Sequence, residues 1–235
     1  MKKALIIFGI ILAVLLAAAF TLPIIFKDDI FAAVKKEIDK SVNADVVLEP
    51  DNFSLSLFSN FPSITVSVKD LGVINRAPFA GEVLFATESF EVEVNLGDVL
   101  FGDQMRLKGI TLVRPIINVK VLEDGRANYD IAVPSTDTVA TTAEESGEFS
   151  FGIDHWELVE ADIVYDDKSI PVLAEFKNLN HSGSGDFTQA VFDLKTKTSV
   201  DTMNIVYAGD AYLANKRADI DITISISEDF TKYTF

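Results

Sequence analysis

Apolar and polar residues alternate in short runs over most of the chain after residue 45. The alternation is cleanest in Ile64–Lys69, Phe90–Leu96 and Ile220–Ser227. Because successive side chains of a strand point to opposite faces, a period of two predicts strands with one dry face and one wet face. Turn sequences such as Glu123–Arg126 and Ser182–Gly185 separate the runs. The pattern therefore predicts a mainly β fold with about ten antiparallel strands.

A segment near the N-terminus has a different pattern, because no charged residue occurs from Ala4 to Phe26. A helix of that length measures about 35 Å at 1.5 Å per residue, which is enough to span the hydrocarbon core of a bilayer. Lys2 and Lys3 precede it, and basic residues mark the cytoplasmic side of a membrane helix. We expect residues 1–27 to be a cytoplasmic stub and transmembrane anchor, with the rest of the chain across the membrane.

A cleaved signal peptide is the alternative interpretation of this segment. Ala17–Ala19 resembles the small-residue site at which a signal peptidase cuts. The apolar run continues past Ala19 to Phe26, however, and is longer than the apolar region of a usual signal peptide. The length of the run favours the anchor.

Three further regions follow the anchor. Residues 28–44 are expected to form a short amphipathic helix, because Ile30, Val34, Ile38 and Val42 recur every fourth residue. Its apolar stripe would cover one end of a sheet, or else lie on a membrane surface. Two β regions, 45–133 and 149–235, flank a mobile acidic loop rich in Ser and Thr at 134–148. We expect the second β region to continue beyond the given chain.

The charge and the composition exclude several classes of protein. Lys and Arg number 20 against 36 Asp and Glu, which gives a net charge of −16. Such an acidic chain, with no basic cluster, repels phosphate backbones, so nucleic-acid binding is excluded. No cysteine is present, which removes disulfides, thiolate metal sites and cysteine nucleophiles. The lack of cysteine is also typical of bacterial envelope proteins.

Candidate catalytic and metal-binding residues are scarce. The two histidines, His155 and His181, are far apart in the sequence and lack the spacing of a metal or acid–base site. Gly183–Gly185 lacks the outer glycines of a nucleophile elbow. The pairs Glu123–Asp124 and Asp166–Asp167 lack the alternating ligands of a calcium loop. We expect no enzyme activity, no metal and no cofactor.

The order of features along the first 133 residues is more informative than any single motif. A basic start and an apolar segment with Leu22–Pro23 near its end lead into a short helix and a series of strand motifs. These motifs are Val46–Glu49, Phe53–Phe58 with Pro62 after it, Val68–Asn75, Phe85–Val94, Gly109–Ile117 and Asp124–Tyr129. In this order the motifs resemble the AsmA family of envelope proteins, whereas residues 149–235 resemble only the general strand pattern of that family.

The resemblance implies a fold, a location and a function. It implies a single pass through the bacterial inner membrane, a cytoplasmic N-terminus and a periplasmic antiparallel sheet curled into a groove. Phospholipid acyl chains would bind in the groove and be transported, in support of outer-membrane homeostasis. The lipid-facing residues would then be Leu55, Leu57, Ile64, Val66, Val68, Val92, Val94 and Leu96.

The same alternation also fits a second fold and a second function. Two sheets could close on each other as a β-sandwich, because sandwich cores use the same residues as an apolar groove. The protein would then be a non-catalytic scaffold or an assembly factor for outer-membrane proteins. Its partner would be an outer-membrane or periplasmic protein.

Overall fold

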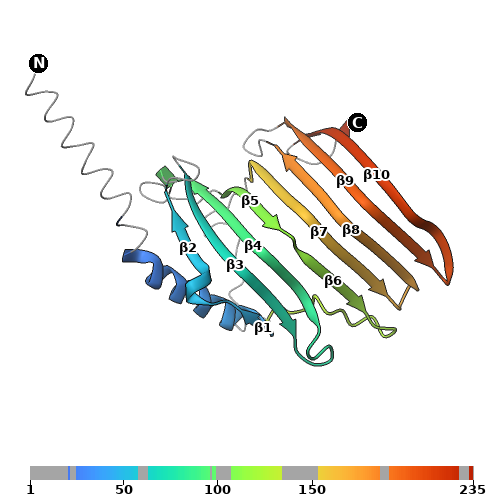
Figure 1. The fold of residues 1–235 in the computed structure, drawn as a ribbon, viewed down its shortest axis with the longest axis horizontal. Helices are drawn as coiled ribbons and strands as arrows, with labels where there is room; N and C mark the ends of the chain where they lie inside the picture. The colour runs from blue at the N-terminus through green and yellow to red at the C-terminus, as the bar shows by residue number, and fades with distance from the viewer. Residues whose placement is uncertain are drawn as a thin grey trace, which may run out of the picture.

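The structure, a computed structural model, describes residues 21, 25–57, 63–95, 97–98, 107–133, 153–185, 191–227 and 233–234. In these residues eleven strands form one mixed sheet, so the mainly β fold is confirmed. The strands are β1 Ala44–Val47, β2 Phe53–Ser56, β3 Ser63–Asn75, β4 Val83–Asn95, β5 Leu107–Val113, β6 Ile116–Val121, β7 His155–Asp167, β8 Val172–Ser184, β9 Val191–Tyr207, β10 Asp210–Ser227 and β11 Tyr233–Thr234. Figure 1 shows the strands side by side in a single layer.

The sheet is mixed, and the prediction of a purely antiparallel sheet is wrong. β7 runs parallel to both β5 and β6, whereas the other neighbouring strands pair antiparallel. A parallel pair requires a crossover of a dozen or more residues, and the chain between the end of β6 at Val121 and the start of β7 at His155 is long enough. A β-sandwich is not formed by the described strands, because all of them belong to the same sheet.

Residues 25–41 form a helix that lies beside β1 and β2 at one end of the sheet (Figure 1). Phe31 and Ile38 pack against a core made by Leu48, Phe53 and Val68. The rings of Phe31 and Phe53 meet edge to face with centroids 5.6 Å apart. The helix therefore covers the first strands with one side of its apolar stripe.

Within the described residues, no helix is both long and apolar enough to cross a membrane. The predicted span Ala4–Phe26 lies outside these residues except at Thr21, Ile25 and Phe26. The predicted loop at 134–148 also lies outside them.

A line of backbone irregularities crosses the sheet at mid-height. Asp70, Arg114, Glu160, Asn178 and Asn215 all have φ between 48° and 54°, the left-handed region that side chains other than Gly, Asn and Asp rarely adopt. Each lies in, or directly after, a different strand of the sheet. Such bulges insert an extra residue and bend the strand. We call this line the crease.

At the crease the alternation of side chains shifts at the same level in neighbouring strands, so paired residues stay on the same face of the sheet on both sides of it. Residues that pair across neighbouring strands share a face, so the pairing shows where alternation is interrupted. In each of six strands, two consecutive residues of one face are three positions apart at this level instead of two. The steps are Val68 to Leu71, Phe90 to Thr87, Leu158 to Ala161, Leu179 to Phe176, Val200 to Met203 and Lys216 to Leu213.

The segment after β6 is bound to β3 and β6 through Asn128. Asn128 is almost fully buried, with 1% of its surface exposed. Its side chain accepts a hydrogen bond from the Lys120 N–H (2.8 Å) and donates one to the Asn118 carbonyl (2.7 Å). The Asn128 carbonyl in turn accepts a hydrogen bond from the side chain of Asn75 (2.6 Å). The amide of Asn128 therefore pairs with the edge of β6 as the backbone of a neighbouring strand would.

Asp167 closes the turn between β7 and β8. Its carboxylate accepts hydrogen bonds from the Ser169 hydroxyl (2.6 Å), the Ser169 N–H (2.8 Å) and the Tyr165 hydroxyl (2.8 Å). The Ser169 hydroxyl is the main cause that lowers the pKa of Asp167. Burial opposes that shift, and the bond from Tyr165 adds to it. The charged form of Asp167 is therefore the form that stabilises the turn.

We expect the stability of the turn to depend on pH through Asp167. A carboxylate with a lowered folded-state pKa stabilises the protein above its unfolded pKa, and this stabilisation is lost as the pH falls through the folded pKa. Asp167→Asn should therefore lower the melting temperature at neutral pH, and the gap to the wild type should narrow between about pH 5 and pH 2. Melting curves followed by circular dichroism test this, and a gap that is the same at all pH values would contradict it.

Candidate functional site

One face of the sheet carries rows of apolar side chains. We call the side of the crease with β2 above and the side with β1 below. Above the crease, two rows of apolar residues cross the strands. They are Leu55, Val66, Val92, Ile110, Trp156 and Ile222, and Phe53, Val68, Phe90, Leu112, Leu158 and Ile220. These two rows are interrupted on β8 and β9 by Gly183, Thr196, His181 and Thr198. Below the crease a third row consists of Val46, Val73, Phe85, Ile117, Ile163, Phe176 and Met203. We call these three rows the apolar face.

The predicted lipid-facing residues lie at the end of the apolar face that the helix covers. Leu55 pairs with Val66 and Val66 with Val92, so these three share one face, and Ile64 pairs with Val94 on that same face. Leu57, Val68 and Val94 are buried, Val68 in the core under the helix. Leu96 lies outside the described residues. The structure thus brings six of the predicted residues, Leu55, Ile64, Val66, Val68, Val92 and Val94, to one surface that is already largely in contact with the protein itself.

The more open part of the apolar face lies on β5 to β10, where the sequence prediction named no site residue. Ile110, Leu158, Ile163, Phe176 and Met203 are all half-buried. On β10 the exposure rises, to 47% for Ile220 and 39% for Ile222. The alternation of Ile220–Ser227 was a signal that could have identified this surface. The apolar residues on β5 to β9 could not be assigned to a face from the sequence, because the alternation changes by one residue at the crease.

The only tryptophan of the chain, Trp156, lies on the apolar face next to a glycine. A β-carbon on Gly183 would be 2.0 Å from the Trp156 ring, so the indole lies against the bare backbone of β8. The imidazole of His181 is close to this ring, with centroids 6.2 Å apart, and its Nδ1 is 2.8 Å from the Thr198 hydroxyl. Trp156 therefore reports on the apolar face through its fluorescence.

Substitution of Gly183 should displace this ring. We expect Gly183→Ala to move the indole away from β8 and into water, and to shift the Trp156 emission to longer wavelength. Overpacking of this kind costs about 1–3 kcal/mol of stability. Gly72→Ala is the matched control, because a β-carbon there would lie in ordinary contact, 3.5 Å from that of Val47. An unchanged emission spectrum in Gly183→Ala would contradict the position of the indole.

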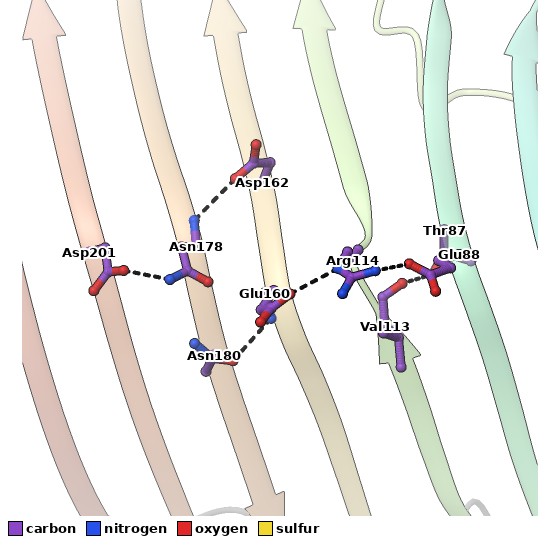
Figure 2. Close-up of polar contacts among 9 residues, drawn as sticks. All are labelled: Thr87, Glu88, Val113, Arg114, Glu160, Asp162, Asn178, Asn180 and Asp201. Carbon is purple, nitrogen blue, oxygen red and sulfur yellow. Dashed lines mark hydrogen bonds and ion pairs between the residues drawn. The ribbon is translucent and has the colours of Figure 1, made fainter.

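The opposite face carries a chain of polar contacts along the crease (Figure 2). The guanidinium of Arg114 binds the carboxylates of both Glu88 and Glu160, the latter at 2.9 Å. These bonds, Glu160 first and then Glu88, raise the pKa of Arg114. All three side chains are more than half exposed, so the ion pairs add little stability and mainly fix the geometry of neighbouring strands.

Side chains also replace backbone hydrogen bonds that the bulges interrupt. The N–H of Glu160 donates to the side-chain oxygen of Asn180 (3.0 Å), and the N–H of Asn178 donates to Asp162 (3.1 Å). The Thr87 hydroxyl donates to the carbonyl of Val113 (2.8 Å), where β5 ends. Burial of Asp162 would raise its pKa, but the bonds from Lys177 and from the Asn178 N–H outweigh burial and lower the pKa. The crease is therefore held by satisfied polar groups.

The two histidines lie on opposite faces of the sheet. His155 covers Gly109 on the polar face, where its Nε2 is 3.6 Å from a carboxylate oxygen of Glu93. His181 lies on the apolar face beside Trp156. In the part of the chain that the structure describes, no three His, Asp or Glu side chains are grouped to hold a metal ion.

The geometry defines a class of protein, namely a single-layer β-sheet with one apolar face that a helix closes at one end. The AsmA family matches residues 1–221 of the chain, and the chain belongs to this family. Membership of the family indicates a function associated with the cell envelope. A comparison with curated proteins found no match.

Proposed function

We propose that the protein binds phospholipid acyl chains on its apolar face and supports phospholipid transport in the cell envelope, without catalysing a reaction. The observation that carries the proposal is the apolar face itself, whose rows run from β2 to β7 above the crease and from β1 to β9 below it, with two further apolar residues on β10. Aliphatic and aromatic side chains without polar partners suit acyl chains, which form no hydrogen bonds. Burial of such surface contributes about 25 cal/mol per Å².

The single-layer architecture supports the proposal further. In a sandwich a second sheet would cover the apolar face, but all described strands belong to one sheet, and the helix packs on the core of its first strands. A large apolar surface of this kind marks a binding site on a soluble domain. Strands of 13 residues, such as β3, β4, β7 and β8, extend about 43 Å. A bound acyl chain has room along a strand.

The proposal includes a location. The protein would be anchored in the bacterial inner membrane by Ala4–Phe26, with Lys2 and Lys3 in the cytoplasm and the sheet in the periplasm. Protease treatment of spheroplasts tests this topology. Digestion of the sheet region in intact spheroplasts is expected, and protection until the inner membrane is lysed would contradict the topology.

Quenching of Trp156 tests lipid binding directly. The full chain is mixed with phospholipid whose acyl chains carry bromine, which quenches tryptophan on contact, and with unlabelled lipid for reference. We expect Trp156 emission to fall with the brominated lipid. In the matched control, Trp156→Phe is combined with Glu157→Trp, which moves the indole to the polar face. Equal quenching at both positions, or none at Trp156, would contradict the proposal and favour the scaffold.

A further inference from the structure

The helix at residues 25–41 also carries apolar residues that the core of the sheet leaves exposed. Phe26, Ile30 and Val34 recur every fourth residue and therefore lie one above another on the helix surface. They are 49%, 38% and 38% exposed, whereas Phe31 and Ile38 pack on the core. We call Phe26, Ile30 and Val34 the outer stripe. As a row of exposed apolar side chains it is a candidate contact surface.

The charges of the helix suit an approach to a lipid surface. Four lysines and four carboxylates balance over residues 25–41, whereas the whole chain carries −16. The helix is thus an electrically neutral part of an acidic protein. An anionic membrane surface attracts basic residues and repels acidic ones. The neutral helix can therefore reach the headgroups where the acidic remainder of the chain would be repelled.

Continuity along the chain identifies the membrane as the apolar partner. Phe26 is the last residue of the uncharged segment Ala4–Phe26 and also the first residue of the outer stripe. The stripe extends about 12 Å from Phe26 to Val34 at 1.5 Å per residue. Amphipathic helices at a membrane bury their apolar side about 5–10 Å into the boundary between headgroups and acyl chains.

We infer that the outer stripe lies in the lipid interface, while Phe31 and Ile38 of the same helix pack on the apolar face of the sheet. The inference rests on the proposed membrane anchor and deepens the proposed function. The helix would contact the bilayer and the sheet at once, and would so hold the covered end of the apolar face at the lipid surface.

Spin labels test the depth of the helix. Because the chain has no cysteine, single-cysteine variants of the full chain can be labelled without background. The variants are Ile30→Cys and Val34→Cys on the stripe, Ala32→Cys as the matched control, and Leu15→Cys within the predicted span. Ala32 is exposed and lies between the two stripe positions in the chain but on the far side of the helix. The proteins are reconstituted in phosphatidylethanolamine and phosphatidylglycerol vesicles.

The ratio of oxygen to nickel collision rates reports depth, since oxygen concentrates in the bilayer and the nickel complex stays in water. We expect a high ratio at Ile30 and Val34 and an aqueous ratio at Ala32. Aqueous ratios at Ile30 and Val34, with a high ratio at Leu15, would overturn the inference and leave the proposed function intact. A high ratio at Ala32 would overturn the one-sided orientation. An aqueous ratio at Leu15 would overturn both the anchor and the inference.

Discussion

Asn128→Ala should lower the free energy of unfolding by about 3 kcal/mol, one of the largest effects that a single substitution in this fold can have. The change removes the partners of the Lys120 N–H and the Asn118 carbonyl. A buried backbone group without a partner costs about 1–3 kcal/mol. For a protein of this size, the melting temperature should fall by about 6–12 °C. Urea unfolding followed by circular dichroism measures the loss.

Asn118→Ala is the matched control for this prediction. The side chain of Asn118 donates one solvent-exposed hydrogen bond, to the Val83 carbonyl (3.0 Å). In the variant, the backbone carbonyl of residue 118 still accepts the hydrogen bond from the Asn128 side chain. We expect that substitution to cost about 1 kcal/mol or less. Equal losses for the two variants would show that the amide of Asn128 does not act as a strand partner.

Ile110→Asp should reduce lipid binding on the order of 100-fold. An aspartate placed in an acyl environment costs about 2.5–3.5 kcal/mol, and each 1.4 kcal/mol is a factor of ten in affinity. Ile110 is half-buried at the middle of the sheet. Val94 is a poorer choice, because only 8% of it is exposed and a charge there would disturb folding itself. Binding is measured by native mass spectrometry of the lipid that copurifies with the protein.

Thr111→Asp is the control for the lipid prediction. Thr111 is the next residue of β5 and lies on the polar face, paired with Glu91 and Glu157. It should retain its lipid at wild-type levels, and both variants should keep the circular dichroism spectrum of the folded sheet. Retention of lipid by a folded Ile110→Asp protein would rule out the apolar face as the binding surface.

The alternation predicted the strands well, since Ile64–Lys69 lies in β3 and Phe90–Asn95 in β4. Local patterns could not predict the parallel pairing of β7, because it depends on a crossover whose path is not a property of any strand. The positions of the bulges in the crease could not be predicted from the sequence either. Asp70, Asn178 and Asn215 are of types that tolerate a left-handed backbone, but Arg114 and Glu160 are not. The backbone N–H groups of both are hydrogen-bonded to neighbouring strands.

The sequence predicted an apolar surface on the sheet, but it did not predict which strands carry the open part of that surface. The motifs that resemble the AsmA family lie before residue 133, so the predicted lipid-facing residues came from β2 to β4 and the segments beside them. The helix contacts that region through Phe31 and Ile38. Which strands a short helix covers depends on the angle at which it packs, and spacing along the sequence does not contain that information.

The crease also limits how such a sheet can evolve. If one strand lost its bulge residue, for example Asp70 of β3, every side chain beyond that point would turn to the other face. Val73 would then point to water, while its partner Phe85 stayed on the apolar side. An insertion or deletion in one strand at the crease is compatible with the sheet only when the adjacent strands change by the same number of residues. The bulges of neighbouring strands therefore depend on one another.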